Sequence, residues 1–439
     1  MATKISCCRI CHNPNLLTVF DLGSHALSSR FPKIDSPDPI EAPLVLVKCD
    51  DTSNLEKSDH EKITQLSFHN QKEHCGLLQL SHNVSEDELY LQHYGYRSGL
   101  NNTMIQHLSG LVSEIEGKIQ LFNEDIVLDI GSNDCTLLKA YHNGDQLCRV
   151  GIDPTGKQFN QYYPDSVCLL PVFFSAEAFK KKFGDRKAKI VTTVSMFYDL
   201  PDPLTFVADI KSILDPDGIW VTEQSYCLTM LERNSFDTIC HEHLEYYMFK
   251  QLRYIANSVG LKIIDVSLNE CNGGSFRVTL AHKGIESEAV KEMIEVEESL
   301  ALHTLQPLCE FVDRCEQMKK DLMTKLMGYK EEGKTIYLYG ASTKGNTLLQ
   351  YYGLDSSIIT AAAERNPEKY GRHTPRTHIP IISEEEMREH KPDYLLVLPW
   401  HFKKEFLERE KSYLENGGSI IFPLPQLEVY KKSSLNYGD

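Results

Sequence analysis

The feature that most constrains the fold is an apolar stretch, Ile126 to Cys135, that runs into an acidic residue and a tight turn (Ile-Val-Leu-Asp-Ile-Gly-Ser-Asn-Asp-Cys). A continuous apolar run that ends at a glycine is typical of a buried parallel strand followed by a turn and a helix. Gly131 lets the backbone approach a ligand closely, and Asn133 tolerates the positive φ that glycine would otherwise supply. A second apolar segment ends in Asp153, about 20 residues further on, where such folds hydrogen-bond a ribose. The sequence therefore predicts a parallel nucleotide-binding βαβ unit.

The turn contains one glycine followed by Ser-Asn-Asp, so it lacks the three-glycine dinucleotide fingerprint. It resembles the first motif of class I methyltransferases, which bind S-adenosylmethionine. Ser195 follows the next β-branched run, at the carboxyl end of a predicted strand, where open α/β sheets place their ligands. The resemblance implies a cofactor site made of Asp129, Gly131, Asn133, Asp134, Asp153 and Ser195. Taken alone, the motif leaves another nucleotide-binding βαβ unit open.

Length and composition restrict the class of protein. A chain of 439 residues is expected to hold about two to four domains. The net charge of −16 argues against nucleic acid as the main partner. No apolar run is long enough to cross a bilayer, and the first residues lack the apolar core of a signal peptide. Thirteen cysteines, most of them scattered singly, favour reduced thiols and a metal site in a cytoplasmic protein over a disulfide framework.

The N-terminal region carries a Cys-x2-Cys knuckle at Cys8 and Cys11. Cys49 and Cys75 are the candidates for the second pair, with a polar, charge-rich segment inserted between them. Four thiolates would bind a tetrahedral zinc ion, and that zinc would be structural because no coordination position remains for chemistry. His74 or Cys7 could replace one ligand. Small buried cysteines without a metal are the alternative.

Two further segments carry polar and aromatic groups. His241, Glu242 and His243 follow Cys240, and their spacing differs from the His-Glu-x-x-His motif of zinc proteases. Imidazole is the usual proton acceptor near neutral pH, and on a helix His243 would share a face with Tyr246 or Tyr247. The alternative is a histidine pair packed under a loop. Upstream, the segment around Tyr94 and Tyr96 would line a polar ligand or form a surface connector.

These segments together resemble the sugar-nucleotide C-methyltransferases of deoxysugar biosynthesis, such as the 3-C-methyltransferases of thymidine-diphosphate 4-keto sugars. The resemblance covers nearly the whole chain and rests on the zinc module and on the motifs at 94–99, 129–134, 236–243 and 273–277. It implies that His243 removes the proton next to the ketone, with Glu242 and His241 in the same catalytic segment. It also implies that Tyr94 or Tyr96 helps to hold the sugar.

Three positions depart from the pattern of that family. Cys240 stands where a tyrosine is expected, Tyr198 lies where a histidine is expected, and Cys135 replaces a glycine of the cofactor loop. The first two changes fall on the substrate side. They keep two alternatives open: an O- or N-methyltransferase acting on another polar small molecule, and a catalytically silent binding protein with the same fold.

The C-terminal region contains a second strand–turn–helix unit at Thr335 to Asn346, which fails as a P-loop because an asparagine replaces the phosphate-binding lysine. Lys344 near the start of that helix could still hold a diphosphate. Before it, an amphipathic helical region suggests a brace between domains or a dimer contact. We therefore expect an α/β protein, monomeric or homodimeric, with a zinc module (1–89), a methyltransferase domain (90–285), a helical linker (286–333) and a C-terminal Rossmann-like, substrate-side domain (334–439).

Overall fold

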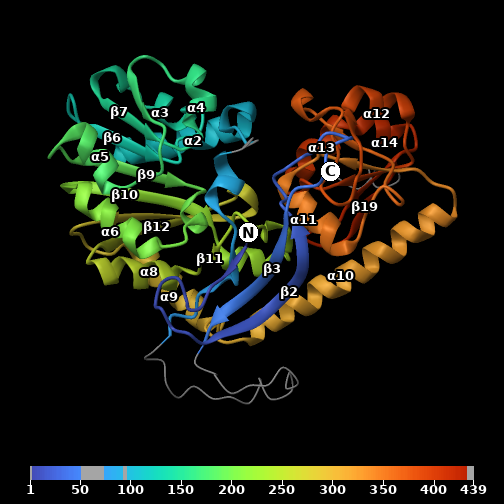
Figure 1. Ribbon diagram of the computed structural model, residues 1–439, viewed down its shortest axis with the longest axis horizontal. Helices are drawn as coiled ribbons and strands as arrows, with labels where there is room; N and C mark the ends of the chain where they lie inside the picture. Colours follow the sequence, from blue (N-terminus) through green and yellow to red (C-terminus); the bar gives the residue numbers. More distant parts are fainter. Residues whose placement is uncertain (1, 51–73, 92–95, 433–439) are drawn as a thin grey trace.

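The computed structural model describes residues 2–50, 74–91 and 96–432. Two α/β lobes lie side by side, and the N-terminal strands run between and below them (Figure 1). Each lobe is built on a largely parallel sheet, so the predicted α/β class with two Rossmann-like units is confirmed. Within the described residues, no helix is both long and apolar enough to span a lipid bilayer.

The first lobe contains a seven-stranded sheet in the order β12-β13-β10-β9-β6-β7-β8. Strand β13 is antiparallel to both of its neighbours, while the strands from β10 to β8 run parallel. This is the strand arrangement of class I methyltransferases. The strands are β6 (Ile126–Ile130), β7 (Cys148–Ile152), β8 (Val167–Leu170), β9 (Ala188–Val194), β10 (Leu214–Ser225), β12 (Lys262–Asn269) and β13 (Ser275–Ala281).

Every residue of β6 is buried, as expected for a central parallel strand covered on both faces. The helices of this lobe pack along the sheet and leave the carboxyl ends of the parallel strands at one edge, where ligands bind in open α/β folds. They are α2 (Asn102–Lys118), α3 (Thr136–Lys139), α4 (Gly156–Phe159), α5 (Ala176–Phe183), α6 (Pro203–Ile213), α7 (Cys227–Glu232) and α8 (Phe249–Val259).

The N-terminal module is built on a four-stranded antiparallel sheet in the order β11-β4-β3-β2. Its strands are β2 (Leu16–Ala26), β3 (Glu41–Cys49), β4 (Leu78–Leu80) and β11 (Glu245–Tyr246). Short β1 (Thr3–Lys4) pairs separately with β5 (His82–Asn83). Because β11 comes from the methyltransferase lobe, the predicted boundary near residue 89 separates two parts of the chain that share one sheet.

The second lobe contains a six-stranded sheet in the order β16-β15-β14-β17-β18-β19, parallel except for β19. Its strands are β14 (Ile336–Tyr339), β15 (Ala362–Glu364), β16 (Ile381–Ser383), β17 (Tyr394–Val397), β18 (Ser419–Phe422) and β19 (Glu428–Tyr430). Its helices are α11 (Thr343–Tyr352), α12 (Glu384–His390), α13 (Lys403–Arg409) and α14 (Lys411–Glu415).

Two helices connect the lobes: α9 (Glu288–Ser299) and the long α10 (Gln306–Glu331), which runs from the lower centre of the molecule beneath the second lobe (Figure 1). Near its start, the Arg314 guanidinium donates to the Leu231 carbonyl oxygen at 2.7 Å. Near its end, Tyr329 stacks on Tyr394 with ring centroids 3.8 Å apart. Helix α10 is therefore a brace between the lobes, one of the two roles that its amphipathic pattern suggests.

Candidate active site

The four predicted zinc ligands are brought together. The sulfur atoms of Cys8, Cys11, Cys49 and Cys75 lie within 4.8 Å of one another, and the pairs Cys8–Cys75 and Cys11–Cys49 are 3.4 Å apart. Zinc–sulfur bonds of about 2.3 Å in a tetrahedron separate sulfurs by about 3.8 Å, so the cluster fits a zinc ion. The Asn13 amide also donates to the Cys49 sulfur. Among the described residues, the cluster includes neither Cys7 nor His74.

The zinc module is bonded directly to the segment that carries His243. In the β4–β11 ladder, Gln79 lies opposite Glu245. Arg9, between the first two cysteines, donates to the Gln79 side chain and lies 3.6 Å from the buried Glu245 carboxylate. Burial raises the pKa of Glu245, and the Arg9 guanidinium opposes that rise. The zinc knuckle and the segment that carries His243 are therefore parts of one buried polar network.

The predicted cofactor loop has the backbone geometry that the sequence indicates. Gly131 has a φ of 75° and Asn133 a φ of 48°, so the expected positive φ of Asn133 is confirmed. Cys135, where a glycine was expected, also adopts a left-handed conformation with a φ of 68°. Ser195, at the end of β9, has a φ of 53° and accepts a hydrogen bond from Asn272 at 3.1 Å. Left-handed non-glycine residues are strained and cluster at ligand sites.

Two of the three predicted acidic cofactor residues, Asp129 and Asp153, lie at the carboxyl ends of β6 and β7. Asp129 is buried and accepts a hydrogen bond from the Thr192 hydroxyl at 2.6 Å, and burial raises its pKa to about 7. Asp153 accepts from the backbone amide of Asn133 at 2.7 Å and from the amide of Thr155 at 2.7 Å. Asp153 thus ties the turn after β6 to the turn after β7.

Asn133 and Asp134 bind a segment of the chain itself. Asn133 accepts from the Ser98 amide at 3.0 Å and donates to the Tyr96 carbonyl oxygen at 3.1 Å. Asp134 accepts from the Gly99 amide at 3.0 Å, and a Cβ atom at Gly99 would lie only 2.5 Å from that carboxylate. Segment 96–99 therefore forms a wall of the cofactor loop. Tyr96 is half-exposed, and Tyr94 lies outside the described residues.

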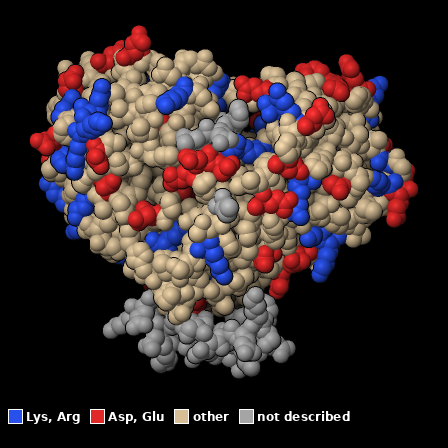
Figure 2. Space-filling view, in the orientation of Figure 1, with Lys and Arg blue, Asp and Glu red and all other residues tan. Residues whose placement is uncertain are grey.

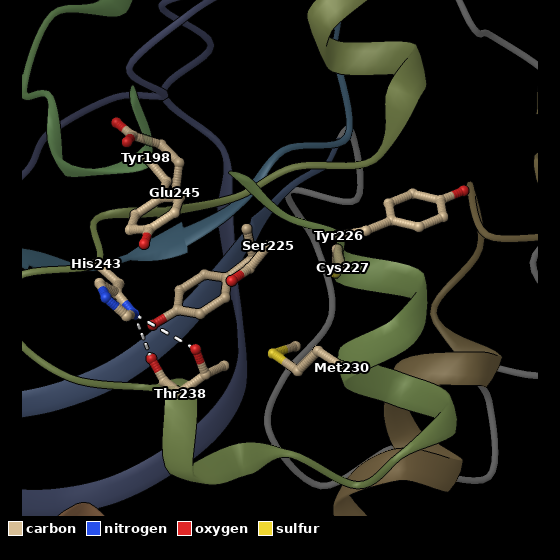
Figure 3. A pocket seen from close by; sticks show the side chains of 9 residues that line it. Tyr198, Ser225, Tyr226, Cys227, Met230, Thr238, His243 and Glu245 are labelled. Atoms are coloured by element: carbon tan, nitrogen blue, oxygen red, sulfur yellow. Dashed lines mark hydrogen bonds between the residues drawn. The ribbon is translucent and has the colours of Figure 1, made fainter. Parts of the chain in front are cut away.

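His243 is held from one side of its ring. Its Nδ1 lies 2.7 Å from the Thr238 carbonyl oxygen, which can only accept, so Nδ1 donates and Nε2 keeps its lone pair (Figure 3). Burial, together with the nearby Lys344 ammonium, lowers the pKa of His243 to about 4. The ring is consequently neutral near pH 7, which is the form that accepts a proton.

A cavity of about 20 Å³, enough for roughly one water molecule, lies beside His243. The Tyr198 ring meets the imidazole edge-on, with centroids 4.6 Å apart. The Tyr246 hydroxyl is buried and has no hydrogen-bond partner among the described residues, and the same holds for both carboxylate oxygens of the neighbouring Glu242. Such groups are rare in folded proteins and are available to a bound ligand. The cavity is lined by Tyr198, Ser225, Tyr226, Cys227, Met230, Thr238, His243, Glu245 and Tyr246 (Figure 3).

The helical arrangement considered for this segment is wrong. Residues 240–244 form no helix, and β11 follows directly, so the chain is extended where Tyr246 points to the cavity. Tyr247 lies elsewhere and stacks on Phe197 with centroids 5.4 Å apart. His241 is buried 3.1 Å from the Ala42 carbonyl oxygen of the N-terminal sheet and is absent from the cavity lining. A turn at 241–242 directs the two histidines to different sites.

The C-terminal lobe makes three side-chain hydrogen bonds to the methyltransferase lobe. The Trp400 indole nitrogen donates to the buried Asp237 carboxylate at 2.9 Å. The Lys344 ammonium donates to the Asn272 carbonyl oxygen at 2.9 Å, and the Thr347 hydroxyl donates to the Ile239 carbonyl oxygen at 2.9 Å. The loop before His243 is therefore fixed between the second lobe and the N-terminal sheet.

Sequence reasoning also missed a buried charge network under the cofactor edge. Glu223 is 1% exposed and accepts from Arg277, Asn269 and His107. A hydrogen bond with Cys271 and then the Glu223 carboxylate raise the pKa of His107 to about 10. Arg277, from the motif at 273–277, forms ion pairs with Glu223 and Glu114. The apolar residues around Glu223 in the sequence gave no sign of its partners.

A much larger cleft, of about 1030 Å³, opens between the N-terminal loop, the methyltransferase lobe and the C-terminal lobe. Its aromatic lining includes Phe31, Phe159 and Tyr162. Its charged lining is predominantly basic, with Arg30, Lys33, Arg97, Lys369 and Arg372 against Glu88 and Glu368. A basic cleft in an acidic protein raises the local concentration of anionic ligands.

A model of a zinc binding domain matches residues 8–90, and a model of the C-methyltransferase C-terminal domain matches residues 270–425. The chain is 30% identical over 434 residues to the C-methyltransferase NovU of Streptomyces niveus, covering 97% of both proteins. The chain belongs to the C-methyltransferase family. This C-methyltransferase uses S-adenosylmethionine, and zinc is its structural ion.

Solved structures overlap only part of this C-methyltransferase. The methyltransferase in complex with the Trm112 activator of Haloferax volcanii is 14% identical, with a TM-score of 0.35 over 42% of this chain and 95% of that chain. Magnesium protoporphyrin IX methyltransferase of Synechocystis PCC 6803 is 11% identical, with a TM-score of 0.31 over 41% of this chain and 79% of that chain. Because these TM-scores are low, the family assignment rests on the sequence identity to NovU.

Proposed function

We propose that this C-methyltransferase methylates the carbon next to the ketone of a nucleotide-linked keto sugar. The observation that carries the proposal is the state of His243: its Nδ1 donates to the Thr238 carbonyl oxygen, so the lone pair of Nε2 is left to accept a proton. A carbon that bears hydrogen is no nucleophile until its proton leaves, so C-methylation needs such a base. O- or N-methylation depends more on proximity of the two reactants.

In the proposed reaction, Nε2 of His243 takes the proton from the carbon, and the negative charge moves to the ketone oxygen. The Tyr246 hydroxyl, buried beside His243 without a hydrogen-bond partner among the described residues, donates a hydrogen bond to that oxygen. S-adenosylmethionine, when bound, would supply the methyl group to the enolate carbon and would leave as the neutral thioether S-adenosylhomocysteine. Because the cavity beside His243 is only about 20 Å³, side chains around it must move to admit the sugar.

The other residues predicted from the sequence bind the cofactor, bind the sugar or support a loop in this proposal. Asp129, Gly131, Asp153 and Ser195 contact the cofactor at the strand ends, while Asn133 and Asp134 support it by holding segment 96–99. Glu242 offers its buried carboxylate to sugar hydroxyls, and Tyr94 and Tyr96 are assigned to sugar binding by family resemblance. His241 supports the loop through Ala42.

We assign the nucleotide part of the substrate to the basic cleft. Its arginines and lysines suit a diphosphate, and its aromatic rings suit a base. Acidic and basic side chains are interspersed over the face shown in Figure 2, without an extended basic surface for nucleic acid. The absence of nucleic-acid partners, the cytoplasmic location and a monomeric or homodimeric state stay predictions.

Hydrogen exchange in heavy water tests the mechanism. The protein is incubated with a panel of nucleotide-linked 4-keto sugars without methyl donor, and deuterium entry next to the ketone is followed by mass spectrometry. S-adenosylmethionine is then added. We expect exchange, followed by the mass gain of one methyl group, and a loss of exchange of about 10²- to 10⁴-fold in His243→Asn.

His142→Asn, which alters an exposed histidine, is the matched control and should exchange normally. Cofactor affinity, measured by calorimetry, should be nearly unchanged in both variants. Methyl gain that survives in His243→Asn would favour O- or N-transfer. Tight cofactor binding without exchange or methyl gain on any sugar would favour another acceptor class or a binding protein.

A further inference from the structure

A second group of metal-ligand residues lies far from the four cysteines in the sequence and joins the N-terminal module to the C-terminal lobe. Ligand atoms of Asp38, His373 and His378 lie within 4.8 Å of one another. The Asp38 carboxylate is 2.7 Å from Nε2 of His378, and the two imidazole rings meet edge-on with centroids 5.0 Å apart. We propose that Asp38, His373 and His378 bind a second zinc ion.

The donor atoms suit zinc. Two imidazoles and one carboxylate are ligands of zinc sites that keep one position open to water. Nδ1 of His373 lies 3.0 Å from the Thr374 carbonyl oxygen, to which it donates, so Nε2 keeps its lone pair for a metal. The other Asp38 oxygen accepts from the Arg376 amide at 2.9 Å. Outer contacts of this kind orient the ligands in known metal sites.

The backbone of the histidine loop holds this arrangement under strain. Arg376 has a φ of 63° and His378 a φ of 51°, both left-handed at non-glycine residues. The loop is closed by Thr374, whose hydroxyl lies 2.7 Å from that of Thr377 and accepts from the Ile379 amide at 3.0 Å. A strained residue persists where the surrounding structure over-determines it, often at ligand clamps. Here the strained residue carries one of the three ligands.

The nearby cations do not occupy the position of the metal. The Arg376 guanidinium binds the Ser24 carbonyl oxygen and lies 3.8 Å from Glu41. The Arg372 guanidinium donates to the Phe31 carbonyl oxygen at 2.9 Å. The His378 side chain is 60% exposed, so an ion can enter from solvent. A zinc ion would replace the direct hydrogen bond between Asp38 and His378.

The position of this site gives zinc binding a structural consequence. Asp38 belongs to the N-terminal loop whose prolines Pro37 and Pro39 line the basic cleft, and Arg372 lines the cleft from the C-terminal lobe. A metal that joins Asp38 to the histidine loop would fasten these two walls to each other. Zinc is then expected to raise the melting temperature beyond the gain from the four-cysteine site.

Metal stoichiometry tests the proposal. Protein without an affinity tag is prepared with one zinc per chain at the cysteine cluster, and further zinc is titrated by calorimetry and by dialysis with elemental analysis. We expect one more equivalent to bind. Cobalt in that equivalent should lack the thiolate charge-transfer bands that a cysteine site shows.

Asp38→Asn and His378→Gln should each weaken the second equivalent by about tenfold or more while keeping the first, which also reports an intact fold. The matched control is His142→Gln, which removes a surface histidine paired with Glu116 alone and should leave the second equivalent unchanged. The proposal is overturned if no second equivalent binds, or if both site variants bind it as tightly as the parent protein.

Discussion

The backbone amide of Leu80 donates a 2.8 Å hydrogen bond to the carbonyl oxygen of Leu244. Leu80 ends the strand that follows Cys75, and Leu244 directly follows His243. The pairing of Gln79 with Glu245 continues this ladder. The proposed base is therefore carried next to an edge strand of the zinc module's own sheet, although the proposed cofactor residues lie at the other, seven-stranded sheet.

This relationship predicts that loss of zinc reduces turnover more than cofactor binding. Cys11→Ser, or removal of zinc by a chelator, should loosen β3 and β4 and with them the segment that holds His243. We expect turnover to fall by about tenfold or more and the melting temperature to drop, because structural zinc contributes directly to folding. Affinity for S-adenosylmethionine, measured by calorimetry, should change little.

Cys7→Ser is the control for the zinc prediction, since Cys7 is outside the cysteine cluster. It should retain zinc, turnover and melting temperature. Equal losses of turnover and cofactor affinity in Cys11→Ser would contradict a specific link between the zinc module and His243 and would indicate general unfolding.

Substitutions at two neighbouring tyrosines can distinguish a role in the proposed chemistry from a role in packing. Tyr246 and Tyr247 are both buried, and neither hydroxyl has a hydrogen-bond partner in the described part of the chain, but of the two only Tyr246 lines the cavity beside His243. Tyr246→Phe should lower kcat by about 10²- to 10³-fold if its hydroxyl stabilises the enolate oxygen. Tyr247→Phe should leave kcat unchanged. Both variants should be as stable as the parent protein or more so, because each loses a buried hydroxyl whose desolvation costs about 1–3 kcal/mol.

Steady-state kinetics and chemical unfolding of the two phenylalanine variants provide the measurements. A similar loss of kcat in both would mean that Tyr246 acts through packing, and no loss in either would remove it from the mechanism.

The Lys344 ammonium is predicted to set the acid limb of the pH–rate profile. Its positive charge contributes to the low pKa of His243, after burial as the larger cause. Lys344→Gln should therefore raise that pKa, so that kcat/KM begins to fall at a higher pH on acidification. Lys334→Gln, at an exposed ion pair with Asp393, is the control and should not move the limb. An unchanged limb in Lys344→Gln would show that the profile reports another group.

Much of the fold followed from local patterns. The buried run before Gly131 predicted the central strand, and the left-handed Asn133 was expected from the side chains that tolerate positive φ. The four cysteines also came together as proposed, despite the inserted segment. These features could be predicted because each depends on residue types that adopt few other structures or functions.

The arrangement around His243 could not be derived in the same way. Strand β11 contains two residues, too few for a periodic signal, and its partner strand lies in a distant part of the sequence. The His-Glu-His motif marked the segment, but the turn at 241–242 and the pairing of β11 with β4 together place His241 and His243 in different surroundings. Trp400 and Asp237 are likewise brought together only by tertiary packing, and no residue spacing in the sequence indicates their contact.

Acid should destabilise this C-methyltransferase through its buried neutral histidines. Burial is the main cause that lowers the pKa of His25 and His243 to about 4 and that of His401 to about 3. Between pH 6.5, the ordinary histidine value, and these pKa values the unfolded chain binds protons that the folded chain does not, so stability falls as the pH falls. Each such histidine contributes a slope of about 1.4 kcal/mol per pH unit in that window. The raised pKa values of the buried Asp129 and Glu245 carboxyls act in the opposite direction, so the test compares variants rather than the parent protein alone. In urea unfolding at pH 7, 6 and 5, His25→Gln should lose less stability on acidification than the parent protein, whereas His142→Gln, at an exposed site, should match the parent. Equal pH slopes for His25→Gln and the parent protein would contradict the assignment of a neutral buried histidine.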